Sequence, residues 1–90
     1  MREPIAENRK VEMLTTAQLD IMNRGRCPDC NHRGFVMGPR RGNAINIECG
    51  KLDCLARFNV TTGFYNHQIL TGHRIARRSE GGAENWGYPP

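Results

Sequence analysis

The sequence predicts a small β-rich domain that is stabilised by a metal ion, with about three antiparallel strands, one short N-terminal helix and flexible termini. Three observations favour this fold class. The chain has only 90 residues, of which 38% are hydrophobic and 7% aromatic, so its hydrophobic core needs an additional stabilising element. Its four cysteines form a C-x2-C pair and a C-x4-C pair, 18 residues apart. Short runs of alternating apolar and polar residues lie between and after these pairs.

The first predicted element is a helix of about ten residues within the stretch LTTAQLDIMNRG. Thr15 is the candidate N-cap, Gln18 stands in the capping-box position three residues later, and Gly25 ends the helix. An isolated helix of this length is marginal in water. Its apolar residues, Leu19 and Met22 among them, are therefore expected to pack against the metal-bearing part of the chain.

The cysteine pairs predict one structural Zn²⁺ site. A C-x2-C pair followed after 15 to 20 residues by a second pair is a spacing typical of zinc sites. In the first pair, Pro28 stiffens the turn and Gly34 lets the chain leave it. The second pair encloses four residues, GKLD, and is expected to form a looser loop. The predicted ligands are Cys27, Cys30, Cys49 and Cys54.

Other interpretations of the cysteines are less favoured. Disulfides require a secreted context, and the N-terminus has no apolar signal sequence. A thioredoxin-like redox pair needs its first cysteine at the start of a helix, whereas here the predicted helix precedes the pair. Four buried apolar cysteines would not be surrounded by Pro, Asp, Asn, Gly and Lys.

His32 is a rival ligand because it lies two residues after Cys30. Four cysteines already complete a closed site, so His32 is expected to be a surface residue, as are His67 and His73. A catalytic zinc keeps a fourth position open for water, and no H-E-x-x-H, P-loop or Ser/His/Asp motif is present. The sequence therefore predicts no enzymatic activity and no small-molecule substrate.

The strands follow the first cysteine pair. GFVMG predicts a strand, PRRGN a turn and AINIEC a second strand, which together form a hairpin. ARFNVT, after the second pair, predicts a third strand with Phe58 and Val60 on one face. Residues 61–75 fit either a further hairpin or a short helix, because their periodicity does not decide between them.

Residues 27–60 resemble the zinc-ribbon superfamily, in its four-cysteine type, in the motifs CPDC, CGKLDC and ARFNV. The resemblance implies the fold and the metal but not one function, because zinc ribbons serve in transcription factors, polymerase subunits, ribosomal proteins and small phage or prophage proteins. A ribbon with one short helix in front is most similar to the phage-encoded group. Elongation-factor ribbons carry an acidic pair at the hairpin tip, whereas this chain has Arg40 and Arg41 there, so that catalytic role is not carried over.

The predicted domain covers residues 13–75, preceded by a flexible leader at 1–12 and followed by a flexible tail at 76–90. Trp86 and Tyr88 in the tail either fold back on the domain or dock elsewhere. No stretch is long and apolar enough to span a membrane, and a cytoplasmic location is expected.

Charge suggests the partner. The formal net charge is +4, and four zinc-bound thiolates lower it to about +2. Arg24, Arg26 and Arg33 are expected to balance the metal site. The predicted contacts with nucleic acid, or with an acidic protein surface, are Arg40, Arg41, Arg57, Arg77 and Arg78, with Arg74 as a further tail base. The alternative function is a protein-interaction adaptor or inhibitor without nucleic-acid contact.

Overall fold

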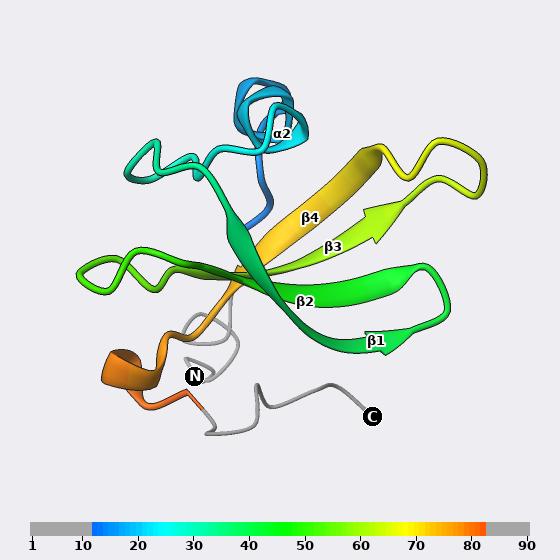
Figure 1. Cartoon of the computed structure of the whole chain (residues 1–90). Coiled ribbons are helices and arrows are strands. Elements are labelled where there is room, and N and C mark those ends of the chain that lie inside the picture. Colours follow the sequence, from blue (N-terminus) through cyan, green and yellow to red (C-terminus); the bar gives the residue numbers. More distant parts are fainter. Residues whose placement is uncertain (1–11, 83–90) are drawn as a thin grey trace, which may run out of the picture.

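The computed structural model describes residues 12–82, which form a four-stranded antiparallel sheet with a short helix on one face (Figure 1). The strands lie side by side in chain order: β1 (Phe35–Arg41), β2 (Ala44–Cys49), β3 (Arg57–Thr62) and β4 (Ile69–Ile75). Helix α2 (Thr16–Asn23) precedes them and the 3-10 turn η1 (Arg78–Glu80) follows. The predicted fold class is confirmed, with four strands in place of about three.

Helix α2 forms where the capping signals predict it. The Thr15 hydroxyl accepts a hydrogen bond from the Gln18 amide at 3.1 Å, and the Gln18 side chain accepts one from the Thr15 amide at 2.8 Å. These two bonds complete the capping box. At the other end Gly25 takes a φ of +82°, a left-handed conformation that ends the helix at little cost. Met22 is the residue of α2 that is fully buried.

Close contacts hold α2 and the segment before it against β4. The Asn23 side chain donates to the Ile69 carbonyl at 3.0 Å and accepts from the Ile69 amide at 2.7 Å. The Leu14 amide donates to the Gly72 carbonyl at 2.9 Å. A Cβ atom at Gly72 would lie 3.0 Å from the side chains of both Leu14 and Val60. Glycine at this position therefore allows Leu14 to pack on the sheet.

The sheet has one apolar face and one polar face. Ile45 pairs with Val60 and Ile47 with Phe58, so these four side chains share the face beneath α2. The ring of Phe58 is fully buried and meets Phe35 edge to face, with ring centroids 6.4 Å apart. The complete core is Leu14, Met22, Cys27, Ile45, Ile47, Cys49, Ala56, Phe58 and Val60.

The polar face of β2 and β3 is also buried, although alternation alone would allow it to be solvated. Asn59 donates to the Asn46 side chain at 2.7 Å, and Arg57 Nε donates to Glu48 Oε2 at 3.0 Å. Arg57 is only 2% exposed and Glu48 only 6%. Charges are buried in proteins when they are paired, and this cross-strand pair meets that requirement.

The β1–β2 hairpin differs from the prediction at its tip. The predicted turn PRRGN is in fact the end of β1 followed by a two-residue turn of Gly42 and Asn43. Gly42 has a φ of +60° and occupies the first central position, as in a type II′ turn. Arg40 pairs with Ile45 and Arg41 with Ala44. Because side chains alternate along a strand, the two arginines point to opposite faces of the sheet.

Residues 61–75, for which the sequence left a hairpin and a short helix open, contain the second hairpin, formed by β3 and β4. The chain continues beyond the predicted domain end at residue 75 into η1. His73, expected at the surface, is half-buried in β4. The predicted leader at 1–12, apart from Glu12, and the positions of Trp86 and Tyr88 lie outside the described residues. No helix within residues 12–82 is long and apolar enough to cross a bilayer.

Candidate metal centre

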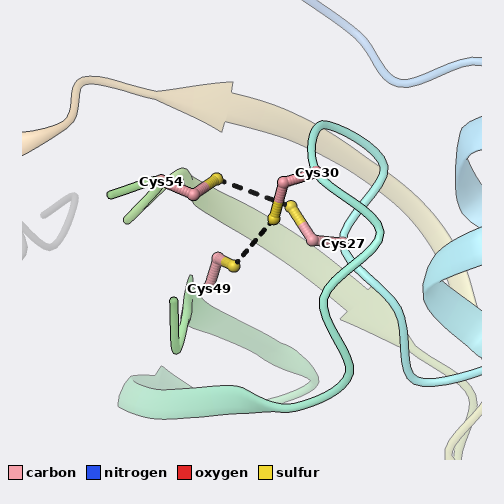
Figure 2. Close-up of side chains that lie close together, drawn as sticks. All are labelled: Cys27, Cys30, Cys49 and Cys54. Carbon is pink, nitrogen blue, oxygen red and sulfur yellow. Dashed lines mark hydrogen bonds between the residues drawn. The ribbon is translucent and has the colours of Figure 1, made fainter. Parts of the chain in front are cut away.

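Four cysteine side chains meet at one end of the sheet (Figure 2). Their Sγ atoms all lie within 4.8 Å of one another, with 3.9 Å between Cys27 and Cys54 and 3.6 Å between Cys30 and Cys49. Tetrahedral zinc with Zn–S bonds of about 2.3 Å places its sulfurs about 3.8 Å apart. A disulfide would need about 2.05 Å. The cluster fits a four-coordinate zinc site, and all four cysteines are free.

The two halves of the cluster share the same local geometry despite their different spacing. The amide two residues after the first cysteine points at its sulfur in both halves, from Asp29 to Cys27 at 3.4 Å and from Lys51 to Cys49 at 3.5 Å. The residue after the second cysteine takes a left-handed conformation in both halves, with φ of 67° at Asn31 and 52° at Leu55. These N–H···S contacts favour thiolate over thiol.

The longer second loop closes on itself. The Cys54 amide donates to the Lys51 carbonyl at 2.9 Å, and the Leu55 amide donates to the same oxygen at 3.0 Å. Cys49, which ends β2, is tied to the start of β3 by a 2.8 Å bond from its amide to the Ala56 carbonyl. The two extra residues are therefore absorbed in a tight turn, and Cys54 still reaches the cluster.

The acid–base properties of Cys27 and Cys49 fit a metal ligand better than a reactive cysteine. Burial raises the pKa of Cys27, and burial raises the pKa of Cys49 to about 12. Burial acts in the same direction on Cys54, but hydrogen bonds from the Ala56 amide and the neighbouring thiols outweigh it and lower the pKa of Cys54. A buried thiol with a high pKa is a poor nucleophile near neutral pH, and it becomes a thiolate when a metal displaces its proton.

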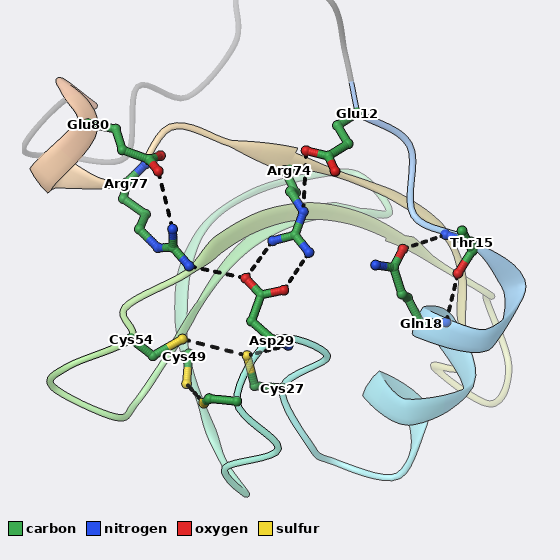
Figure 3. A network of polar contacts seen from close by, with 11 residues as sticks. Glu12, Thr15, Gln18, Cys27, Asp29, Cys49, Cys54, Arg74, Arg77 and Glu80 are labelled. Atoms are coloured by element: carbon green, nitrogen blue, oxygen red, sulfur yellow. Dashed lines mark hydrogen bonds and ion pairs between the residues drawn. The ribbon is translucent and has the colours of Figure 1, made fainter.

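A carboxylate in the first cysteine loop is held by two arginines (Figure 3). Arg74 of β4 binds both oxygens of Asp29, with Nη1 2.6 Å from Oδ2. Arg77 Nη2 lies 3.1 Å from the same Oδ2. The hydrogen bonds from Arg74 lower the pKa of Asp29. Bidentate arginine–carboxylate pairs of this kind fix geometry as well as charge.

We call Asp29, Arg74 and Arg77 the arginine clamp. It links the cysteine loops to β4 and to the residues that follow β4. Arg77 pairs with Glu80 of η1 at 3.2 Å. Burial lowers the pKa of Arg77, but Cys54, Glu80 and Asp29 outweigh burial and raise it. Its Nε is buried and has no hydrogen-bond partner among the described residues. A site of four thiolates and one Zn²⁺ has a net charge of about −2, and cations at this position oppose that charge.

The arginines predicted to contact a partner lie in different parts of the structure. Arg57 is buried against Glu48, which removes it from the accessible surface. Arg77 belongs to the clamp, and Arg78 Nη2 lies 3.5 Å from Glu48 Oε1. Arg40 and Arg41 lie at the opposite end of the sheet from the cysteines (Figure 1).

Arg24, Arg26 and Arg33, which were predicted to balance the charge of the metal site, make other contacts or are exposed. Arg24 pairs with Asp20 on the exposed side of α2 at 3.1 Å, and Arg26 donates to the Asn31 carbonyl at 3.2 Å. Arg33 is exposed, and so is His32, which is not one of the clustered ligands. Sequence reasoning missed Asp29 and assigned Arg74 to a partner, because the two residues are 45 positions apart and no periodicity links them.

No protein-family model matches this chain, and no curated protein or solved structure is significantly similar to it.

The clamp gives a first prediction. Replacing Asp29 with asparagine or Arg74 with alanine is expected to weaken zinc binding about 10- to 100-fold, the usual effect of removing a partner that positions metal ligands. Competition with a chromophoric chelator measures this affinity. Asp53→Asn is the matched control, because Asp53 lies in the other cysteine loop but is 75% exposed and pairs with Lys51. Equal zinc affinity in the Asp29, Arg74 and Asp53 variants would contradict a role for the clamp.

Proposed function

We propose that this chain is a zinc-ribbon module in which Cys27, Cys30, Cys49 and Cys54 hold one structural Zn²⁺, and that the module binds nucleic acid in the cytoplasm rather than catalysing a reaction. The observation that carries the metal assignment is the single cluster of four cysteine sulfurs within residues 12–82. All four positions are filled by protein ligands, as in structural rather than catalytic zinc sites. The CPDC, CGKLDC and ARFNV motifs support the zinc-ribbon assignment, and the short helix in front of the ribbon is the support for a relationship to small phage proteins.

The nucleic-acid part of the proposal rests on the distribution of charge. Every acidic side chain in residues 12–82 forms an ion pair with a neighbouring base, from Glu12 with Arg74 to Glu80 with Arg77. No acidic residue occurs in β1, in the β1–β2 turn or in residues 58–76. Arg40 therefore lies on an end of the sheet without negative charge, with Arg41 beside it. A phosphate backbone is the complementary partner for such a surface.

The alternative is an adaptor that binds an acidic protein surface through the same end. Arginine pairs equally well with carboxylates, and an acidic protein would meet the same complementary charge. Dependence on salt would accompany both partners, so the choice between them depends on direct binding measurements.

The nucleic-acid assignment predicts the effect of removing the tip arginines. An Arg40→Ala/Arg41→Ala variant should bind DNA and RNA more weakly regardless of sequence, with a slope of log affinity against log salt reduced by about one to two, because each phosphate contact contributes about one unit. Fluorescence titrations at several salt concentrations measure the slope. Arg33→Ala is the matched control, since Arg33 is an exposed arginine near the metal end. A wild-type protein with no affinity for DNA or RNA at low salt would contradict the assignment and favour the adaptor.

A further inference from the structure

Two aromatic side chains project from the loop between β3 and β4. Phe64 is 77% exposed and Tyr65 is 98% exposed. Large aromatic side chains are normally buried in a domain of this size, and an adjacent pair left in solvent marks an interaction surface. Both residues belong to the segment 61–75, for which the sequence left a hairpin and a short helix open, and the structure places them at a hairpin tip.

This loop lies at the same end of the sheet as the tip arginines. In an antiparallel sheet with strands in chain order, the β1–β2 turn and the β3–β4 loop emerge together, and Figure 1 shows both on the side away from the cysteines. A hydrogen bond joins the two tips, because the Thr62 amide donates to the Asn43 carbonyl at 3.0 Å. Arg40, Arg41, Phe64 and Tyr65 therefore lie at one end of the sheet, with the two arginines on opposite faces, and we call this the aromatic-basic end.

The loop that carries the aromatic residues is held in shape by its own polar groups. The Gly63 amide donates to the Gln68 carbonyl at 3.0 Å, and the Gln68 amide donates to the Asn66 side chain at 3.0 Å. The exposed aromatic rings thus sit on a loop with a fixed backbone. Rings presented in this way lose little conformational freedom when they bind a flat partner.

An apolar cavity of about 350 Å³ opens beside this end, between α2 and the sheet. Met37 and Ile69 contribute apolar walls, and Arg40 and His67 line it as well. Met37 itself is 64% exposed. The cavity thus has cationic and polar groups at its boundary and no acidic side chain among its described lining residues.

We propose that the aromatic-basic end binds single-stranded nucleic acid, with unpaired bases stacked on Phe64 and Tyr65 and the backbone phosphates neutralised by Arg40 and Arg41. This inference rests on the nucleic-acid function proposed above and specifies its substrate class. Stacking platforms combined with basic residues are the means by which proteins bind single strands without reading sequence. In a duplex the bases are stacked on one another, so their faces are not available to the two rings.

Base stacking on the rings and phosphate contact by the arginines can be measured separately. Stacking is insensitive to salt, whereas phosphate contacts weaken as salt increases. The probes are a fluorescent oligo(dT) strand, an oligo(rU) strand and a duplex of the same length, titrated with zinc-loaded protein. A Phe64→Ala/Tyr65→Ala variant is expected to lose at least about tenfold in affinity for both single strands, with an unchanged salt slope and unchanged duplex binding. The two single strands distinguish DNA from RNA as the preferred source.

Leu52→Ala is the matched control, because Leu52 is an equally exposed apolar residue, 86% accessible, in a cysteine loop at the other end. It should bind single strands like the wild type. If the wild type binds duplex and single strands alike and the aromatic variant retains full single-strand affinity, the single-strand proposal is overturned while the nucleic-acid function stands. If the wild type binds no probe at low salt, both are overturned, and the exposed rings then fit an acidic protein partner.

Discussion

Serine in place of Cys49 or Cys54 is expected to abolish stable folding as completely as serine in place of Cys27. Structural zinc contributes about 10 to 16 kcal/mol of apparent binding free energy in small domains, which equals or exceeds the whole net stability of a typical domain. The two cysteines of the longer loop lie in the same cluster as the other two, within 4.8 Å. We therefore expect Cys49 and Cys54 to bind the metal as strongly as the first pair, despite the unusual C-x4-C spacing.

Amide NMR dispersion and bound zinc are the two measurements for each serine variant. Collapsed dispersion and lost metal are expected for all four positions. His32→Ala is the control and should keep both, because His32 is exposed and outside the cluster. Retention of tight zinc by Cys54→Ser, combined with loss of zinc from the His32 variant, would show that histidine is a ligand and contradict the four-cysteine site.

Removal of Arg57 is expected to be the most destabilising change away from the metal. Methionine at this position preserves volume but leaves the Glu48 carboxylate 7% exposed, with Arg78 at 3.5 Å as its remaining described partner. Breaking a buried ion pair on one side typically costs about 3 to 5 kcal/mol. Replacing both partners, as in Glu48→Leu/Arg57→Met, leaves no uncompensated charge and is expected to recover most of that loss.

Urea unfolding of both variants at a fixed excess of zinc measures the difference. The single variant should have a much lower midpoint than the wild type, and the double variant should lie between them or above. A single variant within about 1 kcal/mol of the wild type, the range of exposed ion pairs, would mean that the Arg57–Glu48 pair is effectively solvated. The same result would support the sequence-based prediction that Arg57 is accessible to a partner.

Local signals in the sequence were sufficient for the fold class and for the four cysteines that cluster. The capping box at Thr15 and Gln18 depends on residues three apart, and the alternation of Ile45 and Ile47 depends on a period of two. The cysteine spacing is itself informative, because two cysteine pairs separated by 15 to 20 residues are typical of zinc sites. These features are confirmed by the helix, the strands and the sulfur cluster.

Local signals could not predict ion pairs between residues that are far apart in the sequence. Whether Arg57 and Arg77 face solvent depends on Glu48 and Asp29, and nothing local to either arginine identifies these partners. The sequence also did not show that the turn has only two residues. Because it does, Arg40 and Arg41 belong to β1, and their side chains point to opposite faces of the sheet. The role proposed for Phe64 and Tyr65 depends on the two hairpin tips lying at the same end of the sheet, which the sequence does not show.

X-ray absorption at the zinc edge of the purified protein tests the metal assignment most directly. It reports whether zinc is present, which elements bind it and at what distance. The expected result is one zinc per chain with four sulfur ligands at about 2.3 Å. A protein without zinc, or a zinc shell that contains nitrogen or oxygen at about 2.0 to 2.2 Å, would contradict a closed site formed by Cys27, Cys30, Cys49 and Cys54.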